Sequence, residues 1–199
     1  MIILLSSLYW FVVALTLALT EIEVEGKFGW AEKTATWSRK VSAPKSFRLF
    51  SGSRTLTGYH IFLNAFLVIF IHSPFVFFKS FTWDLEFQLI ATYLVWALFW
   101  DFLWFILNPY YGWAKFSPKA VWWFGEEPWV FNKLPIKYFV QIGISFILVF
   151  VSYYMNNTFE VITNHASTIL VFVLLTIFTH FFVRPIYHSY YWKLHKKVE

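Results

Sequence analysis

Residues 85–108 read LEFQLIATYLVWALFWDFLWFILN, an apolar run in which Glu86 and Asp101 are the charged positions. A helix needs about 20 mostly apolar residues to cross the hydrocarbon core of a bilayer. The run exceeds that length, and a soluble helix of this size would carry a polar face. The stretch therefore predicts a transmembrane helix.

The same pattern recurs at residues 2–20, 59–78, 136–155 and 166–188. Together these runs predict an all-α integral membrane helical bundle with about five transmembrane helices, in a single transmembrane domain over residues 1–199. A cleaved signal peptide begins with a basic region and ends with small residues at its cleavage site. The first run has no Lys or Arg before it and is followed directly by Glu21, so we expect a retained anchor.

The overall composition agrees with a membrane protein and excludes several other classes. Hydrophobic residues make up 59% of the chain, aromatic residues 25% and charged residues 14%, whereas soluble domains carry about 25% charged residues. Cysteine is absent, which excludes disulfides and thiolate metal sites. The formal net charge of +5 is interrupted by apolar segments, so it indicates attraction to lipid surfaces and not binding of nucleic acid.

Basic residues alternate between the two ends of the predicted helices, and this alternation predicts the orientation. Lys and Arg are concentrated in loops on the cytosolic side of membrane proteins. Fifteen of the 16 lie in or beside the connections 21–58 and 109–135 and the C-terminal tail, and Lys79 alone lies on the other side. We therefore expect the N-terminus outside and the C-terminus in the cytosol.

The two connections on the basic side are unlike ordinary solvent loops. Residues 21–25 read EIEVE, which fits either a short interfacial strand or a continuation of the first helix with Glu21 and Glu25 on one face. Residues 109–113 (PYYGW) and 121–125 (VWWFG) are rich in aromatic side chains. Such rings are favoured in the head-group layer, so we expect connections 21–58 and 109–135 to be interfacial or to dip back against protein.

Polar side chains inside the predicted spans gather at one depth. Asp101 lies seven residues from the basic-side end of its span, roughly 10 Å deep, and His180 lies at a similar depth of roughly 12 Å. Intramembrane ionisable residues are costly and usually face the interior of the bundle. The predicted polar pocket in the cytosolic leaflet consists of Glu21, His60, Asn64, Asp101, Gln141, His180, Arg184 and His188.

Three interpretations of this polar layer are open. It can lock the bundle structurally, with Asp101 and Arg184 forming a buried ion pair and Asn64 and Gln141 bonding across helices. It can bind a ligand or perform acid–base chemistry. It can hold Zn²⁺ or Fe through the imidazole and carboxylate groups of His60, Asp101, His180 and His188, but the His spacing matches no metal-binding motif. Trp96, Trp100 and Trp104 form a stripe on one helix face, which is typical of packing or lipid contact.

Three stretches carry a resemblance to other proteins: EIEVEGKFGW at 21–30, LTGYH at 56–60 and WDFLWFILNP at 100–109. On these stretches the chain resembles small bacterial membrane proteins of unassigned function. The resemblance implies a location in the bacterial cytoplasmic membrane, and it implies no activity, cofactor or site residue.

Two functional hypotheses follow, and a third is weaker. The first is a non-catalytic membrane module that binds lipid or a membrane-protein partner, because no catalytic motif is present. The second is a membrane enzyme that acts on a lipid or isoprenoid through the polar pocket. A transporter is the third, but the inverted repeats typical of secondary transporters are not visible. The pattern identifies no cofactor.

Overall fold

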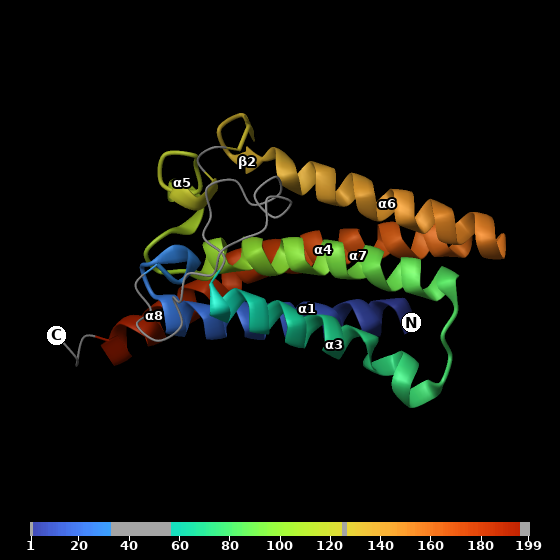
Figure 1. Ribbon diagram of the computed structural model, residues 1–199. Coiled ribbons are helices and arrows are strands. Elements are labelled where there is room, and N and C mark those ends of the chain that lie inside the picture. Colours follow the sequence, from blue (N-terminus) through green and yellow to red (C-terminus); the bar gives the residue numbers. More distant parts are fainter. Residues whose placement is uncertain (1, 33–56, 125–126, 196–199) are drawn as a thin grey trace.

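The computed structural model describes residues 2–32, 57–124 and 127–195. Five helices are long and apolar enough to cross a membrane, and Figure 1 shows them running along a common direction. The first four are α1 (Ile2–Glu25), α3 (Gly58–Phe78), α4 (Trp83–Leu107) and α6 (Ile136–Asn156), and the fifth runs over Glu160–His195. The predicted class is confirmed: this is an all-α, multi-pass membrane protein.

Helix α1 continues past the predicted end of its span. The prediction placed that end at residue 20, whereas the helix reaches Glu25. Glu21 and Glu25 are therefore one turn apart on the same helix face, which decides against the interfacial strand. Most of the connection 21–58 lies outside the described residues, and its predicted interfacial position stays a prediction for that part.

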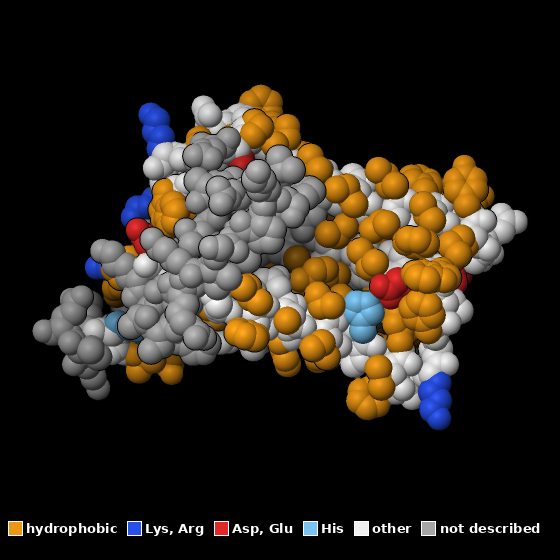
Figure 2. All heavy atoms as spheres, viewed as in Figure 1, with side chains coloured by type: hydrophobic (Ala, Val, Ile, Leu, Met, Phe, Trp, Pro, Cys, Tyr) orange, Lys and Arg blue, Asp and Glu red, His pale blue; other side chains and the backbone are white. Residues whose placement is uncertain are grey.

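Helix α4 is the centre of the bundle. Half of its most apolar stretch is buried inside the protein, compared with 11% for α3, so α3 is a peripheral helix and α4 is surrounded. The indole of Trp96 is 1% exposed and donates to the backbone carbonyl of Trp10 in α1 at 2.9 Å. This bond satisfies a buried donor that would otherwise be costly. On the face shown in Figure 2, hydrophobic side chains cover much of the helical surface that is not grey.

The last span is a single continuous helix with an irregular turn. It consists of α7 (Glu160–Phe178), the π-helical segment η3 (Thr179–Val183) and α8 (Arg184–His195), so it extends beyond both predicted ends, 166 and 188. Pro185 lacks an N–H and its ring clashes with the carbonyl one turn earlier. The π-helical turn immediately before it shifts the hydrogen-bond register, so the helix continues past the proline.

The connection between α4 and α6 folds into what we call the aromatic cap. It contains α5 (Gly112–Lys115), η2 (Trp122–Phe124) and a two-stranded antiparallel pair, β1 (Trp129–Val130) with β2 (Leu134–Pro135). The side chains of Phe116, Trp123 and Phe124 are at most 5% exposed. They pack on Phe105 at the end of α4, with ring centroids 4.5 to 5.9 Å apart. The cap is thus part of the core and closes one end of the bundle.

Candidate functional site

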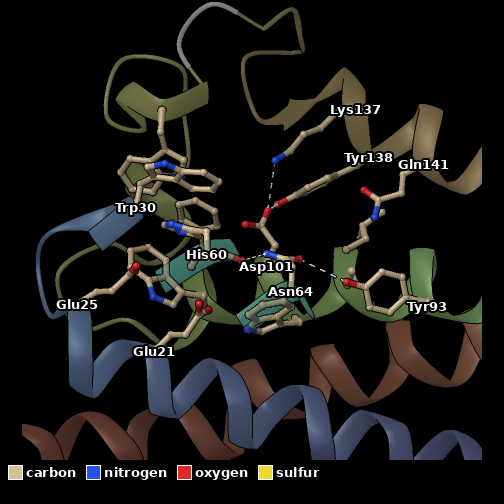
Figure 3. A pocket seen from close by; sticks show the side chains of 16 residues that line it. Glu21, Glu25, Trp30, His60, Asn64, Tyr93, Asp101, Lys137, Tyr138 and Gln141 are labelled. Carbon is tan, nitrogen blue, oxygen red and sulfur yellow. Dashed lines mark hydrogen bonds and ion pairs between the residues drawn. The ribbon is translucent and has the colours of Figure 1, made fainter. Parts of the chain in front are cut away.

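A cavity of about 270 Å³ lies where α1 ends, α3 begins, α4 ends and α6 begins (Figure 3). Ligand pockets of drug size have volumes of about 300–1,000 Å³, so this one suits a small polar group. Its lining combines ionisable, amide and aromatic side chains: Glu21, Glu25, Trp30, His60, Asn64, Tyr93, Trp100, Asp101, Trp104, Phe105, Trp123, Lys137, Tyr138 and Gln141, with Ala97 and Leu98.

Helix α1 contributes two carboxylates to the cavity. Glu21 Oε1 accepts a hydrogen bond from the Tyr59 hydroxyl at 3.1 Å. Glu25 is 7% exposed, and its Oε1 accepts from the backbone N–H of Ala31 at 2.8 Å. That second bond closes a turn in which Trp30 and Ala31 both have positive φ angles, 59° and 51°. Such angles cost about 1–3 kcal/mol in non-glycine residues, and the bond to Glu25 offsets part of this strain.

The turn after α1 brings Trp30 over His60. The two rings are stacked with centroids 4.0 Å apart and planes at 17°. Thr57 is the N-cap of α3: its Oγ1 accepts from the His60 backbone N–H at 3.3 Å, and it lies 2.6 Å from His60 Nδ1. A threonine cap is favourable because it satisfies a free donor of the first helical turn. The imidazole is therefore held between a cap and an indole at the edge of the cavity.

Asp101 is positioned from α6. The Tyr138 hydroxyl donates to its Oδ2 at 2.5 Å, and Lys137 Nζ lies 3.7 Å from the same oxygen. The Lys137 ammonium also lies 3.1 Å from the centroid of the Phe124 ring in the aromatic cap. Both partners come from the first turn of α6, which β2 leads into directly. The arrangement is a carboxylate with one phenolic hydroxyl and one cation beside a cavity.

Amide and phenol groups line the side of the cavity that faces the middle of the bundle. Asn64 Nδ2 donates to the His60 carbonyl at 2.7 Å, and the Tyr93 hydroxyl lies 3.5 Å from Asn64 Oδ1. Gln141 Nε2 donates to the carbonyl of Leu94 at 2.8 Å. These groups therefore mark the boundary between the polar cavity and the apolar interior (Figure 3).

The structure brings five of the eight predicted pocket residues to this cavity: Glu21, His60, Asn64, Asp101 and Gln141. The other three lie elsewhere. His180 belongs to the π-helical turn, where its ring packs on Phe181 at 5.0 Å. His188 Nε2 lies 2.8 Å from the carbonyl of Leu107, so it caps the C-terminal end of α4, whose last carbonyls have no helical partner.

The predicted ion pair between Asp101 and Arg184 is wrong. Arg184 packs over the first residue of α5, where a Cβ added to Gly112 would lie 2.9 Å from its Nη2. Asp101 is paired with Lys137 instead. Lys137 is the second residue of the predicted span 136–155, and the sequence pattern groups it with the basic residues of the neighbouring connection and not with the polar layer.

The structure does not bring the candidate metal ligands together. Of its four candidate ligands, His60 and Asp101 line the cavity, and His180 and His188 do not. Within the parts of the chain that the structure describes, no group of three or more His, Asp or Glu side chains is arranged to hold a metal ion. We do not propose a metal site.

Several lining residues were missed by the sequence pattern. Trp100 and Trp104 were interpreted as packing or lipid contact, yet both line the cavity. Lys137, Tyr138 and Trp123 come from segments that the pattern treated as interfacial or as the end of a span. The acidic pair Glu21 and Glu25 was visible as an i, i+4 spacing, and this is the one signal that could have extended the predicted site.

No protein-family model, no curated protein and no solved structure matches this chain. The function of the site is therefore inferred from the residues that line it.

A double-mutant cycle tests the revised partner of Asp101. Asp101→Asn and Lys137→Met are expected to show a coupling of about 0.5–1 kcal/mol in the free energy of unfolding, since both side chains are only partly buried. Asp101→Asn and Arg184→Gln share no partner, so their effects should add to within about 0.5 kcal/mol. Unfolding in detergent micelles measures both cycles. A larger coupling of Asp101 with Arg184 than with Lys137 would show that Arg184 is the partner of Asp101.

Proposed function

We propose that this protein is a non-catalytic membrane module that binds an amphipathic lipid, with the head group in the polar cavity. The observation that carries the proposal is the position of the cavity at one end of a series of apolar hollows along α4. Tyr93 lines both the polar cavity and the first hollow. A bound molecule would therefore have a polar end and an apolar end, which is the chemistry of a lipid.

The hollows lie between α1, α3 and α4. The first has a free volume of only about 10 Å³, too small for a hydrocarbon tail unless α3 moves outward, and it is lined by Trp10, Ile71, Leu89, Thr92, Tyr93 and Trp96. The second has a volume of about 310 Å³ and shares Trp10, Leu89 and Thr92 with the first. Leu85 and Asp101 lie about 24 Å apart along the axis of α4. This distance is most of the hydrocarbon thickness of a bilayer, which is about 30 Å. That length favours one long hydrocarbon tail.

The peripheral helix α3 supports a route for such a tail. It forms one wall of the hollows through Ile71, Pro74 and Phe75, yet little of it is buried. A helix with few packing contacts opens at low free-energy cost. A lipid could thus enter sideways from the bilayer, and this is the reason that we favour a lipid over a protein partner.

A blocking substitution tests the proposal. Thr92 lines both hollows, so Thr92→Trp is expected to fill the groove and reduce the lipid that co-purifies with the protein at least tenfold. The measurement is quantitative lipid extraction after purification in detergent. Ile147→Trp is the matched control, because Ile147 is 62% exposed on the outer face of α6. Equal lipid content in the wild type and both variants would overturn the proposal.

One arrangement favours an enzyme as the second candidate. Asp101 faces the cavity with the Tyr138 hydroxyl at 2.5 Å and Lys137 at 3.7 Å, a set of groups able to move protons near a bound lipid. Incubating the protein with a lipid extract would distinguish the two. New lipid products that disappear in Tyr138→Phe support the enzyme, and unchanged lipids support the binding module.

For the location we propose the bacterial cytoplasmic membrane, with the N-terminus outside, the C-terminus in the cytosol and the cavity in the cytosolic leaflet. The support is the distribution of Lys and Arg: among the residues that the structure describes, only Lys79 lies at the end opposite to the cavity. The positive-inside rule then orients the bundle.

Single-cysteine labelling in intact cells tests this orientation, because the chain has no native Cys. With a membrane-impermeant thiol reagent, Lys79→Cys is expected to react at once. Lys193→Cys, on the exposed end of α8, should react only after the membrane is permeabilised. The opposite labelling pattern would reverse the orientation.

A further inference from the structure

Within the described residues, no ion pair joins the carboxylate of Glu21 or Glu25 to a cation. Among residues 2–32, 57–124 and 127–195, the ion pairs join His72 with Glu86, Lys137 with Asp101, and His195 with Glu23. Glu21 and Glu25 are one turn apart and close enough to repel each other, and Asp101 adds a further negative charge. Burying a carboxylate without a compensating charge is costly, so each of these groups either takes up a proton or pairs with a cation. A cationic ligand in the cavity would supply that charge.

Each of the two carboxylates has one oxygen to spare. The Oε1 atoms accept from Tyr59 and from the backbone of Ala31. The nearest further donors to these carboxylates are the indoles of Trp100 and Trp104, and neither indole N–H meets the geometry of a hydrogen bond within the described residues. Figure 3 shows both side chains rising from α1 toward the cavity. The remaining carboxylate oxygens can therefore accept hydrogen bonds from a ligand that carries positive charge.

Two buried indoles lack an acceptor. Trp104 is 4% exposed, and neither its Nε1 nor that of Trp100 has a hydrogen-bond partner within the described residues. Both side chains line the cavity, Trp100 beside Glu21 and Trp104 beside Glu25. A buried N–H without an acceptor costs about 1–3 kcal/mol. A ligand with oxygen atoms next to its cation would satisfy these donors.

The aromatic walls suit the same cation. Trp30, Trp100, Trp104 and Trp123 line the same cavity as the two carboxylates. The face of an indole attracts a cation with about 0.5–2 kcal/mol, more strongly where water is excluded. Carboxylate oxygens together with indole faces form a recognised arrangement for binding ammonium groups, and spare carboxylate oxygens favour an ammonium that still has N–H donors.

We infer that the polar cavity binds a primary ammonium head group with adjacent oxygen atoms, of the ethanolamine phosphate type, carried by a lipid whose tail lies along α4. This inference rests on the proposed lipid-binding function and specifies its ligand. The ammonium would sit between the two Oε2 atoms, and the neighbouring oxygens would accept from the indole N–H groups.

The test compares lipids that differ only in the head group. The purified protein is mixed in detergent with phosphatidylethanolamine, phosphatidylcholine or phosphatidylglycerol of identical acyl chains, and bound lipid is measured by native mass spectrometry. Phosphatidylethanolamine is expected to bind at least tenfold more tightly than phosphatidylglycerol. It should also exceed phosphatidylcholine, whose quaternary ammonium has no N–H to donate.

Glu21→Gln with Glu25→Gln should abolish this preference, because the double variant removes both charges and retains the side-chain shape. Glu23→Gln is the matched control: Glu23 lies on the same helix but bonds to the Tyr187 hydroxyl at 2.8 Å, away from the cavity. N-acetylated phosphatidylethanolamine, which has no charge on nitrogen, should bind the wild type as weakly as phosphatidylglycerol. This last comparison needs no variant, so it holds even if the double variant fails to fold.

The outcomes separate the two proposals. Tight binding of all three lipids alike, or a preference retained in the double variant, overturns the ammonium site and leaves lipid binding in place. Strong binding of the N-acetylated lipid overturns the ammonium site as well. Absence of bound lipid in every case, with Thr92→Trp indistinguishable from the wild type, overturns lipid binding itself and the ammonium site with it.

Discussion

Replacing Phe105 by Ala is expected to lower the free energy of unfolding by about 3–5 kcal/mol, the range for a fully buried aromatic residue. Phe105 is 1% exposed at the end of α4. Its ring is stacked on Trp123 at 5.8 Å and packs on Phe116 at 4.5 Å. Removing it leaves a cavity bounded by large rings that cannot collapse into the space, and it detaches the aromatic cap from the bundle.

The expected consequence extends to the candidate site. Phe105 and Trp123 both line the polar cavity, so a loosened cap should also weaken retention of bound lipid. Phe131→Ala is the matched control: Phe131 belongs to the same connection but is 94% exposed, and its loss should change stability by less than about 0.5 kcal/mol. Thermal unfolding in detergent compares the two variants. Equal melting temperatures would show that the cap does not pack on α4 as described.

The second large effect is expected at Gly29. A Cβ added there would lie 1.9 Å from Cη2 of Trp123, far inside van der Waals contact. The indole cannot simply swing away, since it is 5% exposed and packs against both Phe105 and Trp104. Gly29→Ala should therefore cost about 1–3 kcal/mol through overpacking, and the upper part of that range is expected.

A second glycine provides the control for this substitution. Gly143 lies within α6 on an exposed face, and a Cβ added there meets nothing within 4 Å. Gly143→Ala should leave stability unchanged or raise it by up to about 1 kcal/mol, because alanine favours the helix. Opposite signs for the two substitutions in the same unfolding assay are the expected result. A neutral Gly29→Ala would mean that the turn after α1 does not contact Trp123.

The helices could be predicted because their signal is local. An apolar run such as 85–108 has one stable conformation in a bilayer, where every backbone N–H and C=O has to be bonded within the segment. The ends were less predictable: α1 continues to Glu25 and the last helix passes Pro185. Both differences depend on neighbours and on backbone register, which a hydrophobic pattern does not report.

The candidate site was partly predictable for a related reason. Polar residues inside a span are costly, so Asp101, Asn64 and Gln141 could be assigned to one interior layer from their depth. The sequence position of a helical residue gives its depth well and its direction around the bundle poorly. Arg184 had the right depth and faces α5, whereas Lys137 came from the first turn of α6 and forms the pair.

The sequence by itself therefore determined the membrane class, the number of apolar helices and the position of each polar residue along its helix, because each of these depends on local chemistry and on a rise of about 1.5 Å per residue. Only the tertiary structure decided which polar residues share the cavity, how the aromatic cap closes it and which carboxylates remain without a cation. Those properties depend on the rotation and packing of helices far apart in the chain. Many rotations bury the same apolar area, and side-chain packing selects among them.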